Sequence, residues 1–248
     1  MDITVNPGRL SGTVAAPPSK SDLHRKCIAA AFCGDGAAVR AAALCDDTRA
    51  TLDCLAAMGF SVGFDGESVR IGGRDPSVRE ATLDCGESGS TARFLLPAAA
   101  YFLDCATLVG RGRLPARPFA ALTDALRANG TAVRGDFLPI AVSGGLHAGV
   151  YRMRGDVSSQ FFTGLLLALP ALGRESSVEL TTPLESAPYV ALTNAVLRAF
   201  GVEIEETPSG FRVPAGAAYR APAGLAAEGD WSSGASSQNA PCLLYTSD

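Results

Sequence analysis

The sequence has no surplus of positive charge, and this excludes one broad class of function. Its 248 residues carry 21 Lys and Arg against 25 Asp and Glu, a formal net charge of −4. Proteins that bind nucleic acid through a basic face have the opposite balance. We therefore expect no nucleic-acid partner. If the protein binds an anion, its positive side chains must gather locally.

Signals for metal, disulfides and membranes are also missing. The seven cysteines form no C-x-x-C pair and there are only two histidines, so we expect no metal site and mostly reduced thiols. The longest apolar runs, such as Phe161–Leu172, are shorter than the ~20 residues of a membrane span. The opening MDITVNPGRL lacks the basic start and apolar stretch of a secretory signal. We therefore expect a cytoplasmic protein without a membrane partner.

What is present is enough apolar sequence for an α/β core, organised as a repeat. Hydrophobic residues make up 47% of the chain and charged residues 19%. Three stretches share one plan: a polar turn, a helix apolar on nearly all sides, a strand, an amphipathic helix ending at glycine, and another strand. The turns recur at intervals of 69 residues, and the glycines, which suit the left-handed backbone after a helix, at intervals of 71. The markers are Ser21, Ser90 and Ser159, and Gly59, Gly130 and Gly201.

This plan places six helices. The apolar helices are expected at residues 22–32, 92–103 and 160–172, and the amphipathic helices at 46–60, 117–130 and 188–201. Strands are expected between the two helices of each unit, at 37–44, 106–110 and 176–182. Further strands should follow the glycines, at 60–64, 131–135 and 202–206. A chance likeness among Ala-rich helices is the alternative, but it does not account for the regular spacing.

The starts of the apolar helices suggest an anion site. Ser21, Thr91 and Ser159 are expected to be N-caps. Free N–H groups and the helix dipole at such ends attract anions. If pseudo-threefold symmetry relates the three helices, their N-termini converge on one face. Cations that suit phosphate or carboxylate lie close by in the sequence, namely Lys20, Arg25, Arg93, Arg113 and Arg117.

Six segments, in order, resemble motifs of the 5-enolpyruvylshikimate-3-phosphate synthase family. They are PPSKSDLHR (17–25), CGESGSTARF (85–94), GRGRLPARP (110–118), GDVSSQFFTGLLLALP (155–170), ESAPYVALT (185–193) and EGDWSS (228–233). The resemblance implies an α/β fold in which repeated βαβαββ units form a pseudo-threefold domain, an inside-out α/β barrel, with most of a second domain missing. Residues 1–12 would be a strand of that missing domain. Residues 13–225 would be the shikimate-3-phosphate-binding domain, with repeats at about 13–80, 81–150 and 151–225, and residues 226–248 a crossover segment and an atypical tail.

The resemblance also implies a reaction. Family members transfer the enolpyruvyl group of phosphoenolpyruvate to the 5-hydroxyl of shikimate-3-phosphate and release phosphate, on the route to chorismate and aromatic amino acids. They need no cofactor and no metal, and the full-length enzymes are expected to be monomers. The two small-molecule substrates would be the partners of this chain.

The resemblance further assigns roles to residues. Lys20 would be catalytic and contact both substrates. Shikimate-3-phosphate would be held by Lys20, Ser21, Arg25, Ser158, Ser159, Gln160, Ser186 and Tyr189. Of these, Ser21 and Arg25 would hold the carboxylate, and the serines at 158, 159 and 186 the phosphate. Phosphoenolpyruvate would be bound by Lys20, Gly89, Arg113 and Gln160, and Arg93 and Arg117 would support the site or brace a loop.

The chain departs from the family in two places. Glu87 stands where the family often has Asn, so it should point away from the site or pair with an arginine. After Ala235 the sequence loses periodicity, which suggests a truncated reading frame ending in foreign sequence, or else a disordered tail. Because the missing domain would supply the Asp general base, we expect this chain to bind substrate but to be poorly active alone.

Three other functions remain open. One is a non-catalytic anion-binding module and another an unrelated repeat scaffold. The third is the enolpyruvyl transferase of UDP-N-acetylglucosamine, but that enzyme typically has Lys-Asn at Lys20-Ser21. It also carries a catalytic Cys in its mobile loop, and residues 110–118 have none.

Overall fold

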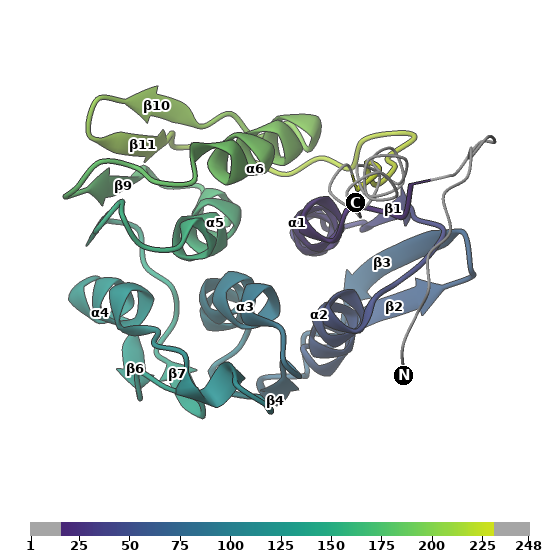
Figure 1. Cartoon of the computed structure of the whole chain (residues 1–248), viewed down its shortest axis with the longest axis horizontal. Coiled ribbons are helices and arrows are strands. Elements are labelled where there is room, and N and C mark those ends of the chain that lie inside the picture. Colours follow the sequence, from purple (N-terminus) through teal and green to yellow (C-terminus); the bar gives the residue numbers. More distant parts are fainter. Residues whose placement is uncertain (1–15, 231–248) are drawn as a thin grey trace, which may run out of the picture.

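The structure, a computed structural model, describes residues 16–230. Three similar units surround a helical centre, with sheets on the outside (Figure 1). The central helices are α1 (Lys20–Ala31), α3 (Gly89–Phe102) and α5 (Ser159–Ala168). The outer helices, between neighbouring sheets, are α2 (Asp46–Ala57), α4 (Ala120–Ala128) and α6 (Ala187–Ala199). Two short 3-10 helices, η1 (Leu114–Ala116) and η2 (Leu169–Leu172), follow β5 and α5. The expected pattern of alternating apolar and amphipathic helices is therefore confirmed.

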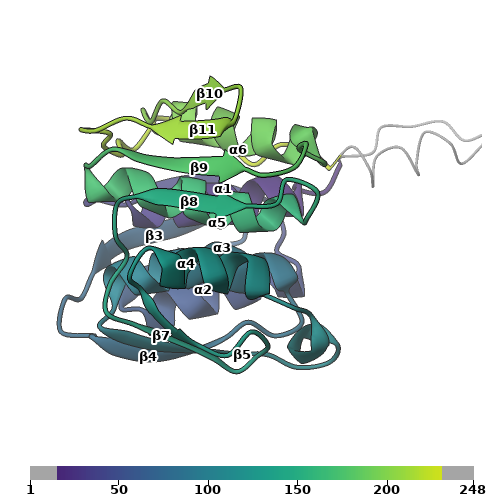
Figure 2. The same cartoon turned by 90° about the vertical axis from the view of Figure 1, so that its left-hand side faces the viewer.

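Each unit contributes one sheet. The first has the order β1-β3-β2, from β1 (Ala37–Arg40), β2 (Phe60–Phe64) and β3 (Ser68–Arg74). The second has the order β4-β5-β7-β6, from β4 (Glu80–Asp84), β5 (Cys105–Val109), β6 (Ala132–Arg134) and β7 (Ile140–Ser143). The third has the order β8-β9-β11-β10, from β8 (Val150–Met153), β9 (Ser176–Leu180), β10 (Glu205–Thr207) and β11 (Gly210–Val213). Figure 2 shows the helices running side by side between these sheets.

The first sheet is completed by the far end of the described chain. In the second and third sheets, a strand that precedes the central helix pairs in parallel with the strand that follows it, β4 with β5 and β8 with β9. At β1 this place is taken by residues 225–227, where Arg40 pairs in parallel with Ala226. The amide of Arg40 donates to the Leu225 carbonyl at 2.9 Å, and that of Ala227 to the Arg40 carbonyl at 2.8 Å.

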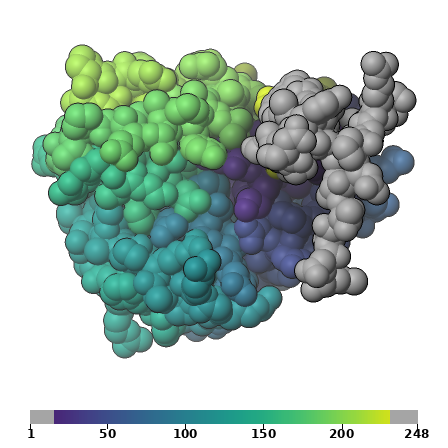
Figure 3. Space-filling model, in the orientation of Figure 1, coloured from purple at the N-terminus to yellow at the C-terminus, as the bar shows by residue number. Residues whose placement is uncertain are grey.

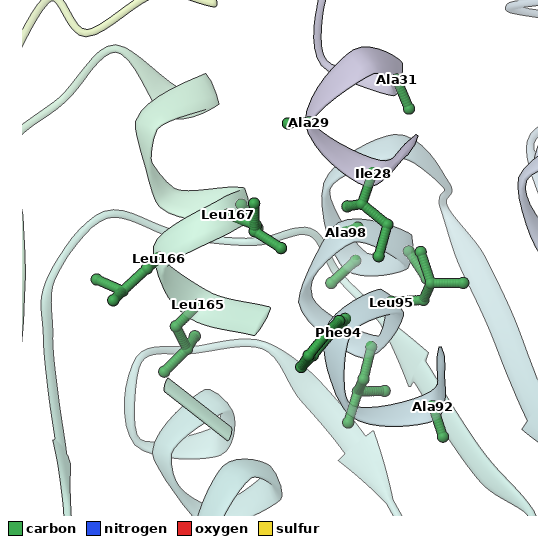
Figure 4. Packing of buried hydrophobic residues seen from close by; sticks show 14 of the residues in the cluster. Ile28, Ala29, Ala31, Ala92, Phe94, Leu95, Ala98, Leu165, Leu166 and Leu167 are labelled. Carbon is green, nitrogen blue, oxygen red and sulfur yellow. The ribbon is translucent and has the colours of Figure 1, made fainter. Parts of the chain in front are cut away.

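The core lies where the three central helices meet. Their apolar residues are buried on nearly every side, as the absence of a polar face predicts. Figure 4 shows part of this packing, with Ile28 of α1, Leu95 and Ala98 of α3, and Leu165 of α5. At Gly164 of α5 the approach is so close that a Cβ atom would collide with the backbone of α3.

The pseudo-threefold relation appears in the contacts of equivalent residues. Arg25, Phe94 and Thr163 are spaced by 69 residues and come from the three central helices. The Arg25 guanidinium carbon lies 4.9 Å from the centre of the Phe94 ring, and Arg25 Nη2 donates to Thr163 Oγ1 at 3.2 Å. The three glycines that follow the amphipathic helices have φ values of 93°, 93° and 77°, as expected for a left-handed C′ position, at Gly59, Gly130 and Gly201.

The expected N-caps are wrong by one to three residues. The capping side chains are Ser19, Ser88 and Ser158, whose hydroxyls accept from the amides of Asp22, Thr91 and Gln160. The expected caps Ser21, Thr91 and Ser159 lie inside the first helical turn. A cap must sit on the extended backbone ahead of the helix, because only from there can its oxygen reach the N–H of the second or third helical residue.

Some expectations concern residues that the structure does not describe. The strand expected at residues 1–12 and the tail after Asp230 lie outside residues 16–230. Within that range, no helix combines the length and the apolar character that crossing a membrane requires.

Candidate anion-binding site

The N-termini of α3 and α5 meet around Gly89, the first residue of α3. A Cβ atom on Gly89 would lie 3.0 Å from Arg117 Nη1, 3.1 Å from Arg93 Nη1 and 3.7 Å from Gln160 Oε1. Residues from α3, from the end of η1 and from α5 therefore surround one small backbone position. A side chain at Gly89 would crowd both guanidinium groups, so glycine lets them lie close to the backbone at the start of α3.

Gln160 ties these two helix starts together. Its side-chain oxygen accepts a hydrogen bond from Arg93 Nη1 at 2.6 Å, and its Nε2 donates to Ser90 Oγ at 3.0 Å. The two contacts fix the amide orientation, since the oxygen faces an obligatory donor. The first turns of α3 and α5 thus present their N–H groups from a fixed geometry.

Arg93 is a buried cation held by aromatic rings. Its guanidinium carbon lies 5.1 Å from the centre of the Phe119 ring and 4.9 Å from that of Phe161, and the residue is 8% exposed. Burial, and secondly the positive charge of Arg117, lower the pKa of Arg93 to about 10, so it stays protonated at neutral pH. Among residues 16–230, no carboxylate lies within ion-pair distance of Arg93 or Arg117. Two adjacent cations without an acidic partner favour a bound anion.

A further cation, Lys20, lies at the start of α1. Lys20 Nζ lies 2.9 Å from Asp47 Oδ2, at the start of α2, and its side chain is 49% exposed. The hydrogen bond with Asp47 raises the pKa of Lys20 above its ordinary value. Ser21 follows it and is half-buried. The face seen in Figure 3 is recessed at its centre, where the purple start of the described chain lies between blue and green residues.

Most of the hydrogen-bond donors of Arg25 are paired inside the fold, which the sequence did not suggest. It is 2% exposed. Its Nε donates to Thr193 Oγ1, its Nη1 to the Ser21 carbonyl, and its Nη2 to Thr163 Oγ1 and to the Tyr189 carbonyl. These four bonds leave one guanidinium N–H for any further partner. Burial lowers the pKa of Arg25 to about 10.

The remaining candidate residues lie at the starts of α5 and α6 and beside η1. Ser158 is exposed and Ser159 buried. Ser186 precedes α6 with φ 60° and ψ 34°, a left-handed conformation uncommon for serine, and such strain is frequent at functional sites. Tyr189 is 51% exposed. Arg113, just before η1, is also exposed.

Glu87 lies against the loop that carries Arg113. A side chain at Gly112 would overlap the Glu87 carboxylate, so the carboxylate rests directly on the backbone of this glycine. Gly112 has a φ of 61°, which also disfavours a side chain there. No ion pair joins Glu87 to an arginine among residues 16–230.

A buried series of hydrogen-bonded polar side chains beneath the helix starts was not predicted from the sequence. His24 Nδ1 lies 2.7 Å from Thr51 Oγ1, which lies 2.7 Å from Thr91 Oγ1, which donates to Ser88 Oγ at 2.7 Å. Burial lowers the pKa of His24 to about 3, so the imidazole is neutral at physiological pH. This series of hydrogen bonds joins α1, α2 and α3. Its only sequence signal is the presence of polar residues within apolar helices.

A family model described as EPSP synthase (3-phosphoshikimate 1-carboxyvinyltransferase) matches residues 5–239. The 3-phosphoshikimate 1-carboxyvinyltransferase of Halobacterium salinarum strain R1 is 42% identical over 241 residues, which cover 94% of this chain and 56% of the relative. The protein of the same name from Clostridium kluyveri is 38% identical over 206 residues, covering 82% of this chain and 48% of the relative. The chain thus spans about half the length of these relatives.

Solved structures agree. EPSP synthase from Acinetobacter baumannii superposes with a TM-score of 0.78 and 25% identity, over 93% of this chain and 53% of that one. The enolpyruvyl transferase NikO from Streptomyces tendae superposes with a TM-score of 0.62 at 17% identity, over 91% of this chain and 53% of that one, a likeness of fold. The fold, the order of the six motifs and these matches lead to one conclusion: the chain belongs to the EPSP synthase (3-phosphoshikimate 1-carboxyvinyltransferase) family.

Proposed function

We propose that this chain is the shikimate-3-phosphate-binding part of an enolpyruvyl transferase. The observation that carries the proposal is the meeting of α3 and α5 at Gly89, where Gln160 joins the helices and where Arg93 and Arg117 have no acidic partner within residues 16–230. Such a site suits a ligand with two or more anionic groups. Both substrates of the family, shikimate-3-phosphate and phosphoenolpyruvate, have this character.

The proposed roles follow the resemblance of the six motifs to those of the family. Ser158, Ser159 and Ser186 hold the phosphate of shikimate-3-phosphate through hydroxyls and the α5 N-terminus. Ser21 binds the carboxylate, and Arg25 contributes at most its one remaining N–H. Tyr189 borders the ring. Lys20, Gly89, Arg113 and Gln160 face phosphoenolpyruvate, and Arg93 and Arg117 support them.

The chemistry requires proton transfer and charge stabilisation. The methylene carbon of phosphoenolpyruvate takes up a proton while the 5-hydroxyl oxygen of shikimate-3-phosphate attacks C2 and loses its proton. The tetrahedral adduct then loses phosphate by C–O cleavage while its methyl group gives up a proton, which restores the double bond. Lys20 is the residue of this chain that we propose to act at the reacting centre, as a proton donor or a local positive charge.

Partial length limits what this chain does alone. Because the relatives are about twice as long, a complete site needs groups that residues 13–225, the proposed binding domain, do not supply. We therefore propose substrate binding with little turnover, by a monomeric cytoplasmic protein. A purely non-catalytic anion-binding module is the second candidate, favoured by the same half-length.

Two assays separate these functions. Shikimate-3-phosphate at saturating concentration should raise the Tm, whereas shikimate without the phosphate should raise it less. Release of phosphate from both substrates together measures turnover. A Tm unchanged by shikimate-3-phosphate would contradict the proposal, and a larger rise with UDP-N-acetylglucosamine would transfer it to that substrate. Sustained phosphate release would show that the chain is an enzyme by itself.

A further inference from the structure

The two ends of the described chain are paired at the start of α1. The amide of Ser19 donates to the Glu228 carbonyl at 2.7 Å, and that of Asp230 to the Pro17 carbonyl at 2.7 Å. Pro18 and Gly229 form an antiparallel bridge between them. Residues 225–230 therefore lie between β1 on one side and residues 17–19 on the other. We call residues 17–19 and 225–230 the paired segments.

A buried ion pair on α1 grips the second of these segments. Asp22 is 1% exposed and Lys26 8%, and Asp22 Oδ2 lies 2.7 Å from Lys26 Nζ. Lys26 Nζ also donates to the Ala226 carbonyl at 2.8 Å, and the amide of Glu228 donates to Asp22 Oδ2 at 2.8 Å. Both charged side chains thus form hydrogen bonds with the backbone of residues 225–228. Burying charges is costly, so a pair retained here calls for a reason beyond stability.

Comparison of the three units supplies that reason. At the equivalent positions, 69 and 138 residues later, Asp22 is replaced by Thr91 and Gln160. Lys26 is replaced by Leu95 and Gly164. In those units the edge strand, β4 or β8, leads within a few residues into the central helix and is held to it covalently. Only the first unit takes its edge segment from a remote part of the chain, and only the first unit carries the ion pair.

The pair also closes a ring of hydrogen bonds at the first turn of α1. Asp22 Oδ2 accepts from the Glu228 amide, the Glu228 carbonyl accepts from the Ser19 amide, and Ser19 Oγ caps the Asp22 amide at 3.4 Å. Lys20 and Ser21 lie in the sequence between Ser19 and Asp22, two of the residues that this ring joins. Displacement of residues 225–228 would therefore shift the turn that carries them.

We infer that Asp22 and Lys26 are positioning residues that latch residues 225–228 onto α1 and thereby hold Lys20 and Ser21 in place for the anionic substrate. The part of this inference that concerns substrate rests on the proposed function. Neither residue needs to touch a ligand. The latch replaces, in the first unit, the covalent connection that the other two units have.

The test uses the full chain with the variants Asp22→Asn, Lys26→Met and their double. The matched control is Arg74→Gln in β3, which removes donors to the Met58 and Val78 carbonyls in the same unit, beyond the C-terminal end of α2. Amide exchange at Ser19 and Glu228 is measured by NMR, and the affinity for shikimate-3-phosphate by calorimetry, well below the Tm.

Each single latch variant should lose protection at both amides and bind shikimate-3-phosphate about tenfold more weakly or worse, a change of ~1.4 kcal/mol. Arg74→Gln should lower the Tm but leave both readouts unchanged.

If a single variant does not fold, the double variant, which leaves no unpaired buried charge, should fold and still show both losses. Unchanged protection in folded latch variants would overturn the inference, as would an equal loss of affinity in Arg74→Gln. If wild type itself does not bind shikimate-3-phosphate, the proposed function fails, while the exchange measurement still decides whether the latch exists.

Discussion

Lowering the pH from 7 to 5 should destabilise this protein through one buried histidine, His24. The pKa of its imidazole is lowered from 6.5 to about 3, first because burial penalises the charged form. The unfolded chain therefore binds a proton in the range between these values that the folded chain does not. Stability from this source is fully present above the unfolded pKa and is lost as the pH falls toward the folded one.

The expected size of this pH effect on the free energy of unfolding follows from the two pKa values of His24. Between pH 7 and 5, His24 should reduce the free energy of unfolding by about 2 kcal/mol. This figure depends mainly on the unfolded pKa, because at pH 5 the folded imidazole is still almost wholly neutral. A folded pKa one unit higher would leave it nearly unchanged.

Urea denaturation at the two pH values measures this effect, compared with His24→Asn. Asparagine cannot take up a proton, yet it places a polar atom near the position of Nδ1, where Thr51 can still bond it. The variant should lose about 2 kcal/mol less than wild type on acidification, whatever the carboxylates contribute to both. His147→Asn, which removes the exposed second histidine, should retain the full loss. Equal losses in wild type and His24→Asn would show that His24 does not cause the loss of stability on acidification.

Two further substitutions probe the packing of the central helices. Arg25→Ala removes four hydrogen bonds and the contact with Phe94. It should lower the free energy of unfolding, measured by urea denaturation, by about 3 kcal/mol or more. A loss below ~1 kcal/mol would show that these contacts contribute little to stability. Gly164→Ala places a Cβ atom against the Arg93 carbonyl, so α3 and α5 must separate, at a cost of about 1–3 kcal/mol. Gly34→Ala, where no atom lies within 4 Å of the added methyl, is its control, and an equal effect at both glycines would contradict the close approach.

The repeat could be predicted because it is local information copied three times. The 69-residue and 71-residue intervals placed all six helices, and the three glycines have the expected left-handed backbone. Periodicity also identified which helices are buried on all sides. The strand expected at 202–206, however, lies at Glu205–Thr207, because its register is set by pairing with β11 rather than by its own sequence.

What the sequence could not supply depends on contacts between distant segments. Nothing near Arg25 indicates that Thr163 and Thr193 would take up its donors. The union of residues 225–227 with β1 joins positions nearly two hundred residues apart in the chain, and the caps at Ser19 and Ser88 depend on where each helix starts. At Gly89 the motif indicated a close approach by a ligand, but the gathering of Arg93, Arg117 and Gln160 emerges only in three dimensions.

The most direct test of the proposed site is a calorimetric titration of the full chain with shikimate-3-phosphate, alongside Ser159→Ala. We expect one saturable site per chain, with an affinity that weakens as salt screens the cations and that falls in the variant. Shikimate without its phosphate should bind more weakly. A folded chain that gives no saturable heat with shikimate-3-phosphate, or that binds both compounds equally, would contradict the proposed site.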